Sequence, residues 1–156
     1  MGEIPSIGAS RLSLSPSVWN RMIPLIAAAS IHLCTNQLAT QLAAGGFHGK
    51  RLQYAWAIVQ RESHGHAKEI SATHDYGLFQ INRAAYHKES WWQPKALLTP
   101  KYNIHVAFTY LTQGGHTFWQ WGVTGNGKRH AGYTNASEYA KFRMNLSRFP
   151  AMCKAI

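Results

Sequence analysis

Residues 61–82 read RESHGHAKEISATHDYGLFQIN, and they carry the strongest fold signals in the sequence. The segment begins where a predicted helix, from about Gly49 to Ser63, comes to its end. One face of that helix recurs at steps of three, four and three, which is the helical repeat. The residues on this face are Leu52, Ala55, Val59 and Glu62. A carboxylate therefore closes a stripe that otherwise points into the core.

Glu62 is the first candidate for a catalytic residue. Its position in the last helical turn places it against the negative end of the helix dipole, on an apolar face. Both effects disfavour the ionised carboxylate and raise its pKa. A proton donor that works near neutral pH needs such an environment. The alternative is a structural glutamate that bonds to Ser63 or pairs with Arg61.

Asp75 is the second candidate, because it opens the segment DYGLFQIN. An irregular stretch that is compatible with a hairpin is expected from His64 to Asn82, with a short strand at Tyr76–Ile81. Strand alternation would send every second side chain to the same side of this segment. Gly77 would permit the close approach of another backbone or a ligand. The alternative is a tight turn in which Asp75 is the turn-forming residue.

The rest of the chain predicts a mainly α-helical protein with one small β element. Helices are expected at Pro24–Ala44 and at Thr99–Gln113, each with a proline in its first turn and glycines after its end. A glycine-rich loop, Gly122–Gly132, is expected to lie over the cleft. The last helix starts near Asn135, with Glu138 reaching back in a capping box. Its inward stripe is expected to be Tyr139, Phe142, Leu146 and Phe149.

The chain is expected to form one domain. Residues 1–16 are rich in Ser and Gly and predict a flexible leader, and residues 17–156 predict a single catalytic domain. No cleavable secretion signal is evident, and the apolar stretch Met22–Leu33 is too short to span a bilayer. Cys34 and Cys153 lie near the two ends, where a disulfide and two buried thiols are both compatible with the sequence.

The formal net charge of +10 indicates attraction to polyanions. Anionic cell-wall polymers, anionic membranes and nucleic acid all meet this description. The basic residues are scattered and form no dense arm, which argues against nucleic acid as the principal ligand. We expect a monomer with no cofactor. His64 and His66 are two positions apart and lack an evident third ligand, so no metal site is predicted.

The two segments RESH at 61–64 and DYGLFQIN at 75–82 resemble the signature of lysozyme-like muramidases and lytic transglycosylases. Tyr102-Asn103-Ile104 and the helix that follows are similar to the third motif of the soluble lytic transglycosylases. The resemblance covers about Leu52 to Tyr133, with its motifs in the expected order. Later positions that also fit are Ala107, Tyr110, Leu111, Trp119 and Trp121.

This resemblance implies a mainly α-helical bundle around a glycan cleft, with one small β element. It implies cleavage of the β-1,4 bond between N-acetylmuramic acid and N-acetylglucosamine in peptidoglycan. Glu62 then takes the role of general acid, and the context of a phage endolysin or a tail-associated lysin fits the absence of a signal. The residues that would bind the glycan or support the acid are Ser63, Tyr76, Gln80, Asn82, Asn103, Tyr110, Trp119, Trp121 and Tyr133.

The sequence departs from the family pattern in the late loop. Transglycosylases and goose-type lysozymes carry a Tyr-Asn-Ala-Gly stretch there, whereas this chain reads VTGNG at residues 123–127. The tyrosine that would contact the catalytic glutamate is therefore missing at that place. Tyr133 and Tyr110 are the candidates to supply its hydroxyl.

Three mechanisms are compatible with Glu62 as the acid. If the carboxyl groups of Glu62 and Asp75 are about 5 Å apart, Asp75 could act as a nucleophile with retention of configuration. At about 6.5–9.5 Å, Asp75 could activate a water in an inverting hydrolase. In lytic transglycosylation Glu62 acts alone, and the product carries a 1,6-anhydro ring.

Two other classes of function are also considered. A non-catalytic peptidoglycan-binding module could keep the same scaffold, but a binder has no need to bury an acid. A basic nucleic-acid binder would show strongly salt-dependent retention on DNA.

Overall fold

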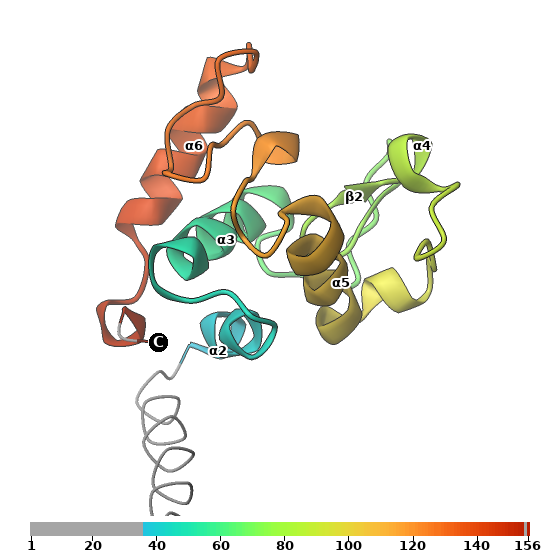
Figure 1. Ribbon diagram of the computed structural model, residues 1–156, viewed down its shortest axis with the longest axis horizontal. Helices are drawn as coiled ribbons and strands as arrows, with labels where there is room; N and C mark the ends of the chain where they lie inside the picture. Colours follow the sequence, from blue (N-terminus) through green and yellow to red (C-terminus); the bar gives the residue numbers. More distant parts are fainter. Residues whose placement is uncertain (1–35, 155) are drawn as a thin grey trace, which may run out of the picture.

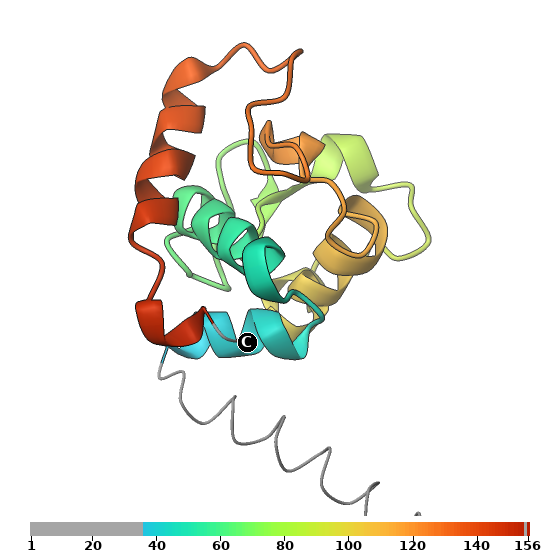
Figure 2. The same cartoon turned by 60° about the vertical axis from the view of Figure 1, so that its left-hand side comes forward.

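The helix α3, Gly49–Glu62, lies in the middle of the molecule and is buried over most of its surface. Its central residues are apolar on every side, which is the pattern of a helix enclosed by other elements. The helix α6, Ala136–Ser147, packs along α3, and α2, Gln37–Ala44, crosses near its start (Figure 1). Figure 2 shows α6 on one side of α3 and α5, Pro100–Val106, on the other. The predicted helix at Gly49–Ser63 is confirmed, with Ser63 as its C-cap.

The structure, a computed structural model, describes residues 36–154 and 156. Within this part of the chain, no helix is long and apolar enough to cross a membrane. The side chain of Asn36 caps α2 by accepting a hydrogen bond from the amide of Ala39. The predicted helix at Pro24–Ala44 is thus confirmed from Gln37 onward. Its earlier part, the leader at residues 1–16 and Cys34 all lie outside the described residues.

The only β-sheet found in the described part of the chain is a very short hairpin. Strand β1, Asp75–Tyr76, pairs antiparallel with β2, Ile81–Asn82, and Asp75 faces Asn82 across the ladder. The prediction of one continuous strand over residues 76–81 is wrong. Gly77 and Gln80 have φ angles of 72° and 48°, so the backbone turns between them instead of extending. The turn places Leu78 and Phe79 in the core together, which strand alternation had excluded.

The predicted helix at Thr99–Gln113 is present but changes its winding. It starts as α5 after Thr99 and continues as the π-helix η2, Ala107–Leu111. The chain then leaves the helix through three residues of positive φ, the first of which is Gln113. Short elements that the periodicity did not predict are α4 (Arg83–Tyr86), η1 (Ala96–Leu98), η3 (Trp119–Trp121) and η4 (Ala151–Cys153).

Helix α6 begins where the sequence predicts it. The side chain of Asn135 accepts from the amide of Glu138, as an N-cap does. The second half of the predicted capping box is wrong, because the Glu138 carboxylate pairs with Lys141 and Arg61 instead. Phe142 and Phe149 of the predicted stripe are buried, and Tyr139 and Leu146 are half-buried against the core. The expected mainly α-helical class with one small β element is confirmed.

Candidate active site

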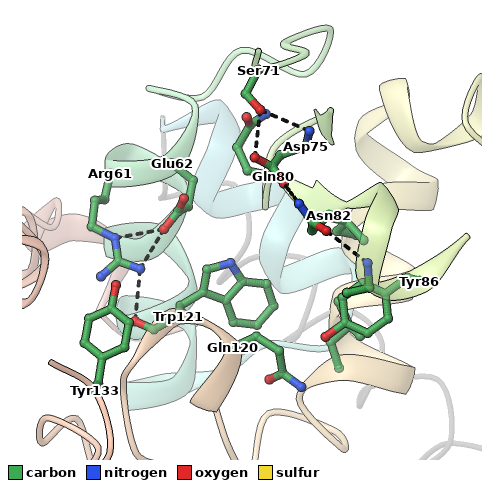
Figure 3. Close-up of a pocket in the computed structure, with 13 residues that line it drawn as sticks. Arg61, Glu62, Ser71, Asp75, Gln80, Asn82, Tyr86, Gln120, Trp121 and Tyr133 are labelled. Atoms are coloured by element: carbon green, nitrogen blue, oxygen red, sulfur yellow. Dashed lines mark hydrogen bonds and ion pairs between the residues drawn. The ribbon is translucent and has the colours of Figure 1, made fainter. Parts of the chain in front are cut away.

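A pocket of about 560 Å³ opens between the end of α3, the hairpin and the segment around η3. Both candidate carboxylates line it, and they come from different elements (Figure 3). Its wall comprises Arg61, Glu62, Ser71, Asp75, Gln80, Ile81, Asn82, Ala85, Tyr86, Leu111, Gln120, Trp121 and Tyr133.

Glu62 lies at the end of α3 with about a quarter of its side chain exposed to the pocket. Two nitrogens of Arg61 donate to the same carboxylate oxygen, Oε1, with Nε at 2.9 Å and Nη2 at 2.6 Å. Burial raises the pKa of the Glu62 carboxyl above its ordinary value, and Arg61 offsets only part of this rise. The charges of Glu138 and Asp75 add to it. The site therefore favours a glutamate that holds its proton to higher pH than a free one.

Arg61 is itself buried, with only 1% of its side chain exposed. Besides Glu62, it donates to the carbonyl oxygens of Trp121 at 3.0 Å and Glu138 at 3.3 Å. The Glu138 carboxylate lies 3.8 Å from its Nε. From the sequence, Arg61 is predicted only as a structural partner that Glu62 could pair with. Arg61 connects the end of α3, the segment around Trp121 and α6. No pattern of neighbouring residues in the sequence predicts these contacts.

Asp75 has a different environment, because neutral donors surround it. Oδ2 accepts from the hydroxyls of Ser71 and Thr73 at 2.7 and 2.5 Å, and Oδ1 accepts from Asn82 Nδ2 at 2.5 Å. Partial burial acts to raise the pKa of Asp75, but these hydrogen bonds outweigh it and hold the pKa below its ordinary value. The carboxylate is therefore ionised at neutral pH. Ser71 and Thr73 were not predicted as site residues.

Two predicted glycan-binding residues of the hairpin line the pocket. Gln80 donates from Nε2 to the carbonyl of Gly77 at 2.9 Å, which holds its side chain against the turn. Asn82 bridges two elements: its Nδ2 binds Asp75, and its Oδ1 caps α4 at the amide of Ala85. Tyr86 and Gln120 also line the pocket and were not predicted.

Five predicted residues do not line the pocket, and three of them lie close to the hairpin turn. Ser63 is buried and donates to the carbonyl of Leu78 at 2.9 Å. Asn103 is fully buried; it donates to the carbonyls of Tyr76 and Leu97, each at 2.9 Å, and accepts from the amide of Phe79. Tyr76 packs edge-on against Trp92. Ser63 and Asn103 hold the hairpin turn in place through these hydrogen bonds, and their part in glycan binding stays a prediction.

The predicted aromatic residues divide into two groups. Trp121 is buried at the pocket and donates from Nε1 to the carbonyl of Phe79, and Tyr133 lies beside Arg61 (Figure 3). Burial raises the pKa of the Tyr133 hydroxyl, which also lies in the fields of Arg61 and Glu62. Tyr110 and Trp119 are exposed and do not line this pocket.

The glycine-rich segment at residues 122–132 shapes the pocket indirectly. A Cβ on Gly122 would lie 2.3 Å from the ring of Tyr133, so the glycine allows that ring to pack on the backbone. The expectation that this loop lies over the cleft is wrong for its tip. The tip closes on itself through Thr124 and Lys128, and Gly127 packs against the ring of Tyr54. Within the described residues, no group of three His, Cys, Asp or Glu is placed to hold a metal ion.

Comparison with known families gives one match. The family model described as the Transglycosylase SLT domain matches residues 42–124, just over half of the chain. This region contains Arg61, Glu62 and Asp75, whereas Tyr133 and Glu138 lie beyond it. The chain matched no curated protein and no solved structure.

Proposed function

The chain belongs to the transglycosylase SLT domain family, and on this premise we propose that it cleaves peptidoglycan with Glu62 as general acid. The bond is the β-1,4 linkage between N-acetylmuramic acid and N-acetylglucosamine. The family membership supports lytic transglycosylase-type activity on peptidoglycan in general. The observation that carries the assignment of Glu62 is its burial in a pocket that still reaches solvent, with a raised pKa.

The reaction starts with transfer of the proton from Glu62 to the glycosidic oxygen. The C1–O bond breaks, and positive charge develops on the muramic acid ring. The C6 hydroxyl of the same sugar then attacks C1 and returns its proton to Glu62. Between the two steps Glu62 is a carboxylate, and two N–H groups of Arg61 stabilise it. No water is consumed, so the product is a 1,6-anhydro sugar and Glu62 is regenerated.

The hydrogen bonds of Asp75 favour this mechanism, in which Glu62 acts without a second carboxylate as nucleophile or base. Three donors already occupy the two oxygens of Asp75, out of about four acceptor positions that a carboxylate offers. Hydrogen bonds that lower its pKa also lower its power as a nucleophile. We assign Asp75 to two tasks: it stabilises the positive charge that develops on the sugar, and it fixes the hairpin that forms one wall of the pocket.

Hydrolysis to a reducing muramic acid is the second candidate. A carboxyl with a raised pKa and an ionised carboxylate line the same pocket, as in glycosidases that use one acid and one charged partner. In that case a water would attack C1 in place of the C6 hydroxyl.

The test is digestion of purified peptidoglycan by the wild type, Glu62→Gln and Glu89→Gln, with mass spectrometry of the released fragments. Glu89 is exposed and outside the pocket, so the Glu89→Gln variant is the matched control and keeps wild-type activity. We expect anhydro products and a loss of about a hundredfold or more in Glu62→Gln. Fragments heavier by one water would establish the hydrolase instead.

The proposed acid is wrong if Glu62→Gln cleaves as fast as the wild type. A wild type that binds peptidoglycan but releases nothing would favour the non-catalytic binding module.

A further inference from the structure

The buried side chain of Arg61 connects the proposed acid to helix α6. We propose that Arg61 is the positioning residue of Glu62, and that Glu138 of α6 holds Arg61 in place. The proposal rests on the proposed function, in which Glu62 is the acid. It assigns part of the active site to a helix that lies beyond residues 42–124, the segment matched by the family model.

The first argument is the geometry of the hydrogen bonds. Nε and Nη2 of Arg61 both donate to Oε1 of Glu62, and no described residue donates to Oε2. An N–H group can approach an oxygen only where that oxygen offers a lone pair. A proton on Oε1 would collide with this pair of donors. Neutral Glu62 must therefore carry its proton on Oε2, so Arg61 selects the oxygen that donates and fixes the rotation of the carboxyl group.

The second argument is that Arg61 cannot easily move. Its guanidinium is removed from solvent, and the carbonyl oxygens of Trp121 and Glu138 accept from its Nη2 and Nη1. A planar guanidinium with donors in fixed directions can satisfy all these acceptors at once. A lysine keeps the charge but has a single nitrogen, so it cannot reach Glu62, Trp121 and α6 together.

The third argument is electrostatic. The charged or titratable groups that act on Glu62 are Arg61 on its own helix, Glu138 on α6 and Asp75 on the hairpin. The Tyr133 hydroxyl also lies in the field of Glu62. Arg61 favours the ionised form of Glu62, and Glu138 opposes it. Replacing Arg61 or Glu138 should therefore move the titration of Glu62 in opposite directions, which no loss of general stability would produce.

The experiment compares Arg61→Lys and Glu138→Gln with the wild type on soluble, uncross-linked glycan strands. The matched controls are Arg143→Lys and Glu89→Gln, which make the same chemical changes at exposed positions outside the pocket. For each variant, kcat and KM are measured over a wide pH range, so that the limb that reports the protonation of Glu62 can be followed.

Arg61→Lys is expected to lower kcat by roughly tenfold to a hundredfold with little change in KM, because the carboxyl group is no longer held in one rotation. It also loses hydrogen bonds that favour the carboxylate, so the pKa of Glu62 rises and the alkaline limb of kcat/KM moves to higher pH. Glu138→Gln removes a like charge near Glu62, so the pKa of Glu62 falls and the alkaline limb of kcat/KM moves to lower pH. Both controls keep the wild-type profile.

A second readout does not depend on turnover. Titration of the Glu62 side-chain carboxyl by ¹³C NMR should show the same opposite shifts in the two variants. If the wild type and Glu62→Gln behave as proposed but both variants keep the wild-type kcat and pH profile, Arg61 and Glu138 do not position the acid. If the wild type is inactive, the proposed function fails, and the NMR titration still decides whether the two residues control Glu62.

Discussion

Glu62 and Asp75 are carboxylates in one pocket with opposite environments. Burial dominates at Glu62 and raises its pKa, whereas hydrogen bonds from neutral donors dominate at Asp75 and lower its pKa. At neutral pH the first is therefore biased toward the acid form and the second toward the anion. A separation of pKa values of this kind assigns different chemical tasks to two identical functional groups.

Tyr133 is the better of the two candidates for the missing family tyrosine. Its ring packs on Gly122, and its hydroxyl lies in the fields of Arg61 and Glu62, whereas Tyr110 stacks on Trp91 away from the pocket. We predict that Tyr133→Phe lowers kcat about fivefold to tenfold, because it removes a hydroxyl that lies in the field of Glu62 and can donate to the reacting groups. Steady-state kinetics on glycan strands measures the effect.

Tyr110→Phe is the control and should stay within twofold of the wild type. A larger loss in Tyr110→Phe than in Tyr133→Phe would reverse the assignment of the hydroxyl.

At the scale of elements, the hairpin turn is held from behind by buried polar contacts. Asn103 of α5 makes three hydrogen bonds to the backbone of residues 76–97, and Ser63 adds one from the end of α3. Two-residue strands have little stability of their own. These contacts therefore fix Asp75 and Gln80 relative to Glu62, because Ser63 attaches the turn to the end of α3 and Asn103 attaches it to α5.

Gly77 permits this attachment, as its sequence position predicted. Its φ is 72°, and a Cβ there would lie 2.2 Å from the Leu97 carbonyl oxygen. We predict that Gly77→Ala lowers the free energy of unfolding by about 3–5 kcal/mol, because backbone strain and a clash with rigid backbone add. Chemical denaturation measures the change.

Gly49 provides the comparison, because its φ is 56° but a Cβ there would meet nothing within 4 Å. Gly49→Ala carries the strain alone and should cost roughly 1–2 kcal/mol. If both variants lose the same free energy of unfolding, the predicted clash between a Cβ at position 77 and the Leu97 carbonyl does not destabilise the protein.

At the scale of the whole molecule, the formal charge of +10 acts over distances larger than the pocket. We expect the protein to accumulate on walls that carry anionic polymers, because a basic surface attracts them at low salt. The prediction is that binding to intact walls weakens by about tenfold or more between roughly 50 and 500 mM salt, as screening shortens the range of the attraction. Sedimentation of walls with bound protein measures it.

Walls stripped of their anionic polymers are the control and should bind more weakly, with little dependence on salt. Salt-insensitive binding to both preparations would assign wall affinity to the glycan pocket alone.

The sequence by itself determined the elements whose signals are local. The inward stripe of α3 that ends at Glu62 follows from the helical repeat, and the start of α6 follows from the N-cap residue Asn135. These properties depend on residues a few positions apart, so a single sequence is sufficient to predict them. The motifs at 61–64 and 75–82 added the family, which the family model confirms.

Only the tertiary structure decided how the site is assembled. Arg61 contacts Trp121 and Glu138, which are 60 and 77 positions away, and Asn103 reaches a backbone amide 24 positions away. Residues 77–80 form a turn and not the predicted strand, and Ser63 and Asn103 of other helices bond to the backbone of this turn. Contacts of this kind depend on how distant segments pack together, and packing is set by the whole core and not by any local pattern.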